Sequence, residues 1–419
     1  MKLIRTFGRT AKAAEALIQT LEQRGAVNTA KVEPVVRRIL AAVQKRGDKA
    51  VIEYATRLDA LERGQPLLVS REEMKAAWEA TDPALQAAMK AARANIRAFA
   101  EAQKTTEWML SPADGVKTGQ IVRPLASVGC YVPGGRYPLP STLLMTATPA
   151  QVAGVERIVV CSPKPAQKTL AAAHLAGVTE FYRIGGAQAI AALAYGTESI
   201  AAVNKIVGPG NLNVTAAKQM VSAECGIDMP AGPTEIVVTS ETLKPQAIAT
   251  DLIAQAEHDP ETLAVFITAN EALAKAVSAE VKALAASNPL AKQSIAARGH
   301  IFVTKSVTEA HTLTNRLAPE HLTVDTLADL AWIQNAGSVF VGPFAPQAMG
   351  DYVSGPNHVL PTGRNGRIRG GLSVMDFVKV ITVQQYTRKG LQSLGPHAAA
   401  LADAEGLAGH AASVRMRMQ

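Results

Sequence analysis

Short runs rich in β-branched and aromatic residues alternate with alanine-rich, helix-like windows between residues 121 and 341 of this 419-residue chain. Such alternation is typical of βαβ units, in which parallel strands share a sheet and helices cover its faces. The expected strands lie at residues 126–132, 157–160, 181–184, 205–207, 235–238, 263–267, 301–303 and 338–341. The expected helices lie at residues 142–152, 166–175, 187–195, 214–223, 245–257, 270–285 and 306–316. We therefore predict two α/β sheets, each built from one half of this series.

The two ends of the chain have helical spacing instead. Apolar residues recur at helical intervals between Val35 and Val43, and Asp82-Pro83 opens an alanine-rich window that reaches about Lys104. Helical patterns return at residues 376–391 and 398–412. We expect the two sheets to lie between small helical segments at the N- and C-terminal ends.

The composition fits a soluble cytoplasmic protein. The chain is 48% hydrophobic and 19% charged, and its apolar runs fall short of the ~18–20 residues that cross a bilayer. The N-terminus lacks the apolar core of a secretory signal. Three cysteines, Cys130, Cys161 and Cys225, cannot all pair and have no C-x-x-C spacing, so we expect them reduced and mostly buried. A membrane partner is not expected.

The net charge of +8 does not indicate nucleic-acid binding, because no basic stripe with stacking aromatic residues is present. The densest basic patch lies at residues 364–369. Two interpretations stay open: a basic surface that attracts anionic small molecules, and a surface charge with no partner.

Histidines gather beside carboxylates in the second half of the chain. Four of only eight histidines lie in segments 255–259, 319–321, 350–358 and 405–410, each of which also carries Asp or Glu. Imidazole and carboxylate groups bind divalent metals and move protons near neutral pH. The clustering suggests a metal site beside an acid/base pair.

Two of these segments resemble metal or substrate sites. Gln255 and His258 are three residues apart in a helical window, so one helix face would present both to an ion. The alternative is an ordinary helix end, stopped by His258 and Asp259-Pro260. Asp351 lies in a glycine- and proline-rich stretch, where it could bind a metal and Asn357-His358 a polar substrate; a turn-forming Asp and an exposed His remain the alternative.

The other two segments carry a carboxylate beside an imidazole. Glu320-His321 stands at the entry of a strand and has the composition of a general acid/base pair. Glu405 and His410 are five apart on the last helical segment, roughly on one side. No H-E-x-x-H, cysteine-based zinc or G-x-S-x-G pattern accompanies them.

Two glycine-rich turns, 131–135 and 206–211, follow expected strands. Glycine lets backbone N–H groups approach a phosphate, and a following helix adds a favourable dipole. Neither turn has the third glycine of G-x-G-x-x-G, so tight turns without a ligand fit the spacing as well.

Six segments in this order resemble the histidinol dehydrogenase family, and the resemblance runs from about residue 45 to the C-terminal tail. The segments are 206–211, 228–235, 251–258, 318–322, 355–362 and 371–374. The resemblance implies two Rossmann-like parallel-sheet domains of an incomplete dinucleotide-binding type. The implied divisions are residues 1–21, a helical segment; 22–127 with 234–372, a larger domain with the metal and catalytic residues; 128–233, an NAD-binding domain; and 373–419, a helical dimerisation segment.

The family's functional residues match positions of this chain. The resemblance implies a zinc ion held by Gln255, His258, Asp351 and His410, and Glu320 with His321 as the catalytic pair. Substrate contacts would come from Thr234, His358 and Glu405, together with His321 and the four zinc ligands. NAD contacts would come from Tyr131, Gln188 and Asn211. Thr234 departs from the serine that the family commonly has there, although the hydroxyl is kept.

The implied activity is the last step of histidine biosynthesis, the oxidation of L-histidinol through L-histidinal to L-histidine with reduction of two NAD. The implied assembly is an intertwined homodimer in which His410 and Glu405 complete the neighbouring site. Three alternatives remain. One is a related dehydrogenase for another polar alcohol, for which the basic 364–369 stretch would suit an anionic group; the others are a zinc hydrolase with Glu320 as base and a non-catalytic binding protein.

Overall fold

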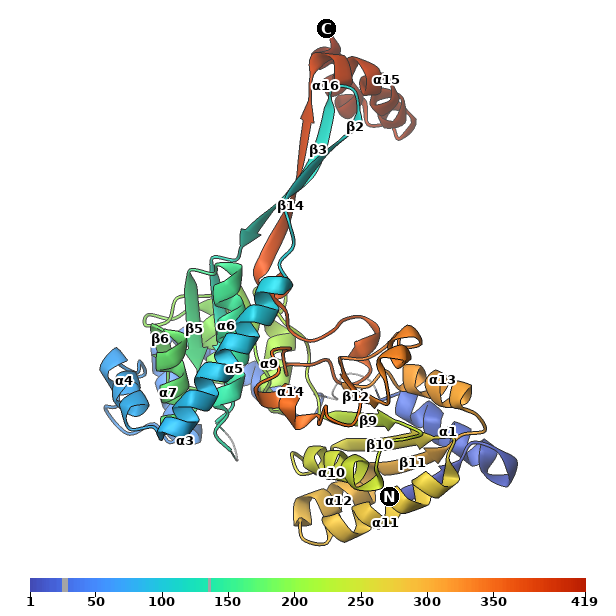
Figure 1. Cartoon of the computed structure of the whole chain (residues 1–419). Helices are drawn as coiled ribbons and strands as arrows, with labels where there is room; N and C mark the ends of the chain where they lie inside the picture. The colour runs from blue at the N-terminus through green and yellow to red at the C-terminus, as the bar shows by residue number, and fades with distance from the viewer. Residues whose placement is uncertain (25–28, 135–136) are drawn as a thin grey trace.

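The computed structural model describes residues 1–24, 29–134 and 137–419, which form two lobes and a long arm (Figure 1). Each lobe contains one parallel sheet with helices on its faces. The predicted α/β class with two parallel sheets is therefore confirmed. Gly135, the last residue of the first glycine-rich turn, lies outside the described residues.

The five-stranded lobe is built around a sheet buried on both faces. Its strands, in the order β6-β5-β4-β7-β8, are β4 (Ser127–Tyr131), β5 (Arg157–Cys161), β6 (Glu180–Tyr182), β7 (Lys205–Val207) and β8 (Gly226–Ile227). One face is covered by α2 (Glu33–Arg46), α3 (Asp48–Leu58), α8 (Gly186–Tyr195) and α9 (Leu212–Val221). The other is covered by α4 (Arg71–Glu79), α5 (Pro83–Ala102), α6 (Pro140–Ala153) and α7 (Gln167–Ala176). Burial on both faces explains the nearly continuous apolar runs of these strands.

The six-stranded lobe repeats this layered plan. Its strands, in the order β1-β11-β10-β9-β12-β13, are β1 (Lys2–Arg5), β9 (Glu235–Thr239), β10 (Leu263–Thr268), β11 (Gly299–Val303), β12 (His321–Val324) and β13 (Ser338–Val341). One face carries α10 (Pro245–Ala256), α11 (Glu271–Ala285) and α12 (Pro289–Arg298). The other carries α1 (Ala11–Glu22) and α13 (Val307–Leu317). The expected N-terminal helical segment thus begins with an edge strand of this sheet.

The packing of the helices differs from the division expected for residues 22–127. Those residues were expected to accompany 234–372, but α2, α3, α4 and α5 pack on the five-stranded sheet. Helical spacing marks the apolar face of a helix without naming the sheet that the face will cover, so the sequence pattern could not decide between the two lobes. The predicted start of α5 is confirmed, because the Asp82 carboxylate accepts hydrogen bonds from the amides of Ala84 (2.8 Å) and Leu85 (3.3 Å).

The arm is an antiparallel ribbon of β2 (Trp108–Ala113), β3 (Val116–Pro124) and β14 (Val378–Tyr386). It reaches away from both lobes and carries α15 (Arg388–Ala404) and α16 (Ala408–Met418) at its tip (Figure 1). The predicted helix at 376–391 was wrong over most of its length. β-Branched residues dominate Val378–Val383, and their pairing with β3 runs the full length of β14.

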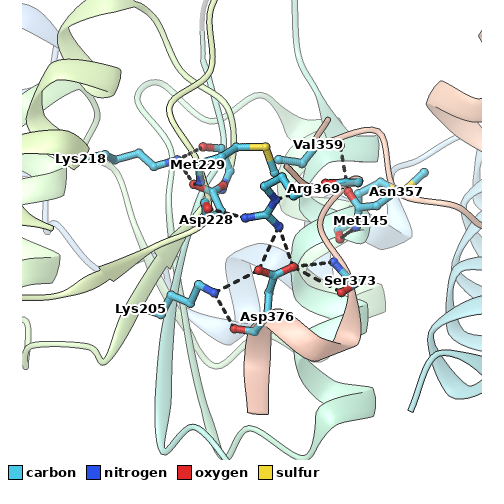
Figure 2. Close-up of polar contacts among 12 residues, drawn as sticks. Met145, Lys205, Lys218, Asp228, Met229, Asn357, Val359, Arg369, Ser373 and Asp376 are labelled. Atoms are coloured by element: carbon cyan, nitrogen blue, oxygen red, sulfur yellow. Dashed lines mark hydrogen bonds and ion pairs between the residues drawn. The ribbon is translucent and has the colours of Figure 1, made fainter. Parts of the chain in front are cut away.

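The root of the arm is anchored by the carboxylate of Asp376 (Figure 2). It accepts hydrogen bonds from the Ser373 amide (2.9 Å), from Arg369 Nη2 (3.0 Å to each oxygen) and from Lys205 Nζ (3.2 Å). Lys205 begins β7, so the arm is attached directly to the five-stranded sheet. None of the helices in the described ranges is both long and apolar enough to cross a bilayer. The three cysteines are buried and form no disulfide, as predicted.

His300 makes the six-stranded lobe sensitive to acid. Burial, reinforced by Lys2, the N-terminal amine and Arg298, lowers the pKa of this side chain to about 4. Below pH 6.5 the unfolded chain therefore takes up a proton that the folded chain refuses, and stability falls as the pH drops toward 4. His300→Leu should reduce the stability difference between pH 6.5 and pH 5 by roughly 2 kcal/mol, measured by urea unfolding of chelator-treated protein.

Phe302→Leu is the matched control, because Phe302 is buried on the same strand and does not titrate. It should lower the free energy of unfolding equally at both pH values. An unchanged pH dependence in His300→Leu would remove His300 as the source of the acid sensitivity.

Candidate active site

A cavity of about 660 Å³ lies between the two lobes. The five-stranded lobe lines it with residues that follow the carboxyl end of β7, including Gly210 and Asn211, and with Thr142 of α6. The six-stranded lobe lines it with Thr234 and Glu320, which stand at the amino ends of β9 and β12. The five-stranded lobe thus contributes the carboxyl end of its strands, and the six-stranded lobe contributes the amino ends. The cavity lies where these ends face each other.

Eight of the twelve site residues that the family resemblance implies line this cavity. They are Thr234, Gln255, His258, Glu320, His321, Asp351, His358 and Asn211. Tyr131, Gln188, Glu405 and His410 do not line it. Helix α10 ends at Ala256, so His258 lies just beyond the helix end, yet it still faces the same cavity as Gln255. Asp351 lies in the short helix α14 (Ala348–Tyr352) rather than in an irregular loop.

A chain of hydrogen bonds orients the carboxylate of Glu320. Gln255 Nε2 donates to Thr234 Oγ1, and Thr234 Oγ1 donates in turn to Glu320 Oε2 (2.7 Å). The same carboxylate oxygen accepts from the Glu235 amide (2.8 Å). Gln347 Nε2 donates to Gln255 Oε1 (2.9 Å), a contact that no local sequence pattern announced. With two donors on one oxygen, Glu320 is held as an oriented, buried base.

His321 presents Nε2 to the cavity as a proton acceptor. Its Nδ1 lies 3.0 Å from the Glu235 carbonyl and 3.6 Å from Glu320 Oε2. A carbonyl only accepts, so Nδ1 carries the hydrogen and Nε2 keeps its lone pair. Burial opposes protonation of this ring, but the Glu320 carboxylate, the Asp351 carboxylate and the Glu235 carbonyl together outweigh it and raise the pKa of His321. The ring is thereby suited to accept a proton at Nε2.

His358 connects the two lobes across the cavity. Its Nδ1 donates to the Asp351 carbonyl (2.8 Å), so Nε2 accepts from Thr142 Oγ1 of α6 (3.1 Å). Burial lowers the pKa of His358, which keeps the ring neutral. Asn357, expected beside it as a substrate contact, instead donates to the Met145 carbonyl (2.6 Å) and is buried (Figure 2).

The metal-binding side chains expected from the sequence divide into two places. Gln255, His258 and Asp351 line the cavity with one amide oxygen, one imidazole and one carboxylate, a donor set that suits zinc. Within the described part of one chain, no three His, Cys, Asp or Glu side chains come close enough to hold a metal. His410 is exposed on α16 at the tip of the arm, and Glu405 is exposed at the end of α15 (Figure 1).

The residues expected to contact NAD lie along the carboxyl edge of the five-stranded sheet. Asn211 caps α9 and accepts hydrogen bonds from the amides of Asn213 (3.0 Å) and Val214 (3.2 Å). Tyr131 and Gln188 are buried: the Tyr131 hydroxyl accepts from the Gly186 amide (3.1 Å), and Gln188 Nε2 donates to Asp59 (2.9 Å). Asp59, whose pKa is raised by burial, was not expected from the sequence.

The charge of the cavity is negative. Asp259, Glu261, Glu320 and Asp351 line it, and no lysine or arginine does among the described residues. Two arginines of the basic 364–369 stretch are used elsewhere: Arg364 donates to the Glu22 carbonyl, and Arg369 to the Asp228 carbonyl and Asp376. The cavity therefore favours a cationic ligand over an anionic one.

Comparison with known proteins agrees with this geometry. The family model described as histidinol dehydrogenase matches residues 22–418. The chain belongs to the histidinol dehydrogenase family. A histidinol dehydrogenase of Methanothermobacter thermautotrophicus is 44% identical over 96% of this chain and 97% of its own, and one of Geobacillus kaustophilus is 46% identical over 91% and 92%. The crystal structure of histidinol dehydrogenase from Elizabethkingia anophelis covers 100% of this chain and 98% of its own, at 33% identity and a TM-score of 0.94. The chain is thus an oxidoreductase by family, and the predicted family is confirmed.

Thr234 should matter through its hydroxyl alone. Thr234→Val removes the bridge between Gln255 and Glu320 while keeping the side-chain volume, so we expect dehydrogenase kcat/KM to fall roughly 10- to 100-fold. Thr234→Ser keeps the hydroxyl and should stay within about threefold of the parent protein. Steady-state kinetics of the two variants, with thermal unfolding as the control for folding, test this. Equal kcat/KM values for Thr234→Val and Thr234→Ser would show that the hydroxyl bridge does not contribute to activity.

Proposed function

We propose that this chain oxidises L-histidinol through L-histidinal to L-histidine in the cytoplasm, with two molecules of NAD as hydride acceptors. The observation that carries the proposal is the acidic cavity with Glu320 and His321 at its wall, in a chain of the histidinol dehydrogenase family. Histidinol carries an amine and an imidazole, both of which an acidic cavity favours. The product places the reaction at the last step of histidine biosynthesis.

Zinc is the metal we propose for Gln255, His258 and Asp351, with His410 as the fourth ligand. When bound, zinc would supply a Lewis acid for the nitrogen groups of the substrate and would have no redox role of its own. The electrons therefore have to leave as hydride, for which NAD is the proposed carrier. Asn211, Tyr131 and Gln188 are the proposed NAD contacts, and Thr234, His358 and Glu405 the proposed further substrate contacts.

His321 and Glu320 divide the proton transfers of the two oxidations. In the first, His321 Nε2 takes the hydroxyl proton of histidinol as hydride leaves its carbon for NAD, giving the aldehyde and NADH. In the second, Glu320 removes a proton from a water that adds to the aldehyde, and His321 returns its proton to the aldehyde oxygen, which gives the diol. The diol then gives its hydride to a second NAD while His321 Nε2 takes a hydroxyl proton, and the resulting acid ionises to the carboxylate. The oriented Glu320 carboxylate and the free lone pair of His321 support these roles.

Two other activities are distinguishable from this one. A related dehydrogenase would oxidise a different polar alcohol, but the acidic lining argues against an anionic one. A zinc hydrolase using Glu320 as base would turn over without NAD.

Purified, zinc-loaded protein should convert L-histidinol and NAD into histidine with two NADH for each histidine, and chelation should abolish turnover. His321→Asn should slow the histidinol step by roughly 10²–10⁴-fold with zinc content unchanged, whereas Glu320→Gln should slow oxidation of added histidinal more than that of histidinol. Product and NADH are followed together. Turnover without NAD would replace the dehydrogenase with a hydrolase, and NADH formed only with another alcohol would reassign the substrate.

We propose further that the protein is a homodimer in which the arm of one subunit reaches the cavity of the other. Apolar side chains stand exposed along the arm in the single chain, among them Trp108, Leu110 and Val380. Such a surface is typical of a subunit interface. His410 and Glu405 lie at the end of this arm, away from the cavity of their own chain, and would complete the site of the partner.

Hybrid dimers test the donation of His410. His410→Ala and His258→Ala should each be inactive as homodimers, because every site lacks one ligand. After mixed refolding, a hybrid contains one intact site if His410 serves the partner, and about a quarter of the parent activity should return. If His410 serves its own chain, every site in the hybrid stays defective and no activity returns.

A further inference from the structure

A buried ion pair, Lys218 with Asp228 (Figure 2), is hydrogen-bonded to Gly208 of the second glycine-rich turn. Lys218 belongs to α9, and Asp228 follows β8. Their side chains are 3% and 0% exposed, so neither charge meets solvent. Removing two charges from water is costly, and an apolar pair would often fill such a place equally well. The burial of this ion pair therefore has to be explained by the groups that the pair contacts.

The pair holds both polar backbone groups of Gly208. Asp228 Oδ2 accepts from the Gly208 amide (2.7 Å), and Lys218 Nζ donates to the Gly208 carbonyl (2.9 Å) as well as to Asp228 Oδ1. The Gly208 amide needs an acceptor and its carbonyl needs a donor, and a carboxylate beside an ammonium group provides both. The Met229 amide donates to the same carboxylate (2.6 Å).

The backbone conformation of Gly208 is also restricted by its surroundings. Its φ of +113° suits glycine alone, and a Cβ there would come within 2.1 Å of the Tyr131 carbonyl oxygen. The next three residues, Pro209, Gly210 and Asn211, line the cavity. The position of Gly208 thus sets where this wall of the cavity begins.

Helix α9 also holds a second part of the cavity lining. Thr215, three residues before Lys218 and therefore on the same face of α9, donates to the Ala231 carbonyl (2.9 Å). Ala231 and Gly232 line the cavity. From the other side, Arg369 Nη1 donates to the Asp228 carbonyl (2.5 Å) (Figure 2). Helix α9 thereby holds both parts of the cavity lining, one through Lys218 and Asp228 and the other through Thr215.

We propose that Lys218 and Asp228 are positioning residues that hold the turn 208–211 in the form that receives the dinucleotide. They touch no reacting atom and act through the backbone of Gly208. The inference rests on the proposed function, because it takes Asn211 as part of the NAD site. It predicts that the pair governs the KM for NAD and leaves zinc and histidinol binding alone.

The test removes both charges together, so that no unpaired charge stays buried. Lys218→Met/Asp228→Asn should raise the KM for NAD about tenfold or more, with zinc content and the KM for histidinol within about twofold. A merely structural pair would lower the melting temperature and the folded fraction but leave the KM for NAD of the folded enzyme unchanged. That second result would overturn the proposal.

Matched variants separate the possible outcomes. Arg157→Met/Glu180→Gln removes an ion pair at the amino ends of β5 and β6 in the same sheet, and should leave the KM for NAD unchanged. If the double variant does not fold, Asp228→Asn alone decides: a rise of about threefold or more supports the proposal, and no rise overturns it. Asn211→Ala tests the NAD site itself. If Asn211→Ala leaves the KM for NAD unchanged, the placement of the cofactor is overturned. If Asn211→Ala raises the KM for NAD and the variants of Lys218 and Asp228 do not, only the role of the ion pair is overturned.

Discussion

The active-site geometry depends on the register between two neighbouring parallel strands, β9 and β12. His321 pairs with Ile236 across these strands, so the entry of β12 lies beside the entry of β9. This register lets Glu320 accept from the Glu235 amide and lets His321 Nδ1 donate to the Glu235 carbonyl. One residue of β9 thus orients both members of the acid/base pair. A shift of one residue would move both side chains out of register with Glu235 and break these hydrogen bonds.

The cavity also depends on how the two lobes are joined. His358 bonds to Thr142, Asn357 to the Met145 carbonyl, and the Gly232 amide to Thr362 Oγ1 (2.6 Å), and all three bonds involve the segment that runs from β13 of the six-stranded lobe to the root of the arm. These bonds use side chains at or next to the cavity, so the same residues join the lobes and shape the site. A polar, hydrogen-bonded joint of this kind fixes orientation, which is what hydride transfer between two bound molecules requires.

The sequence predicted most of the regular structure of the lobes, because buried parallel strands and the helices between them leave strong local patterns. It missed β1, β2, β3 and the two-residue strand β8, and it took most of β14 for a helix. Those strands are short or exposed, and β1 and β14 have partners far along the chain: β14 pairs with β3 across more than two hundred residues.

The candidate site was predictable to a similar extent. The family motifs named eight residues that do line one cavity. They could not indicate Thr142, Gln347 or Asp59, whose hydrogen bonds to His358, Gln255 and Gln188 join distant segments. Nor could spacing alone show that His410 and Glu405 stand far from the cavity of their own chain, since that follows from the arm.

The edge strand β1 bears on how the protein forms during synthesis. The sheet of the five-stranded lobe and the helices on its faces come from one piece of chain, from α2 to β8, so most of this lobe can form once that piece has left the ribosome. Strand β1, Lys2–Arg5, emerges long before its partner β11, which begins only at Gly299. Strand β1 therefore stays unpaired while most of one lobe can fold, and it joins its sheet only when the second lobe forms.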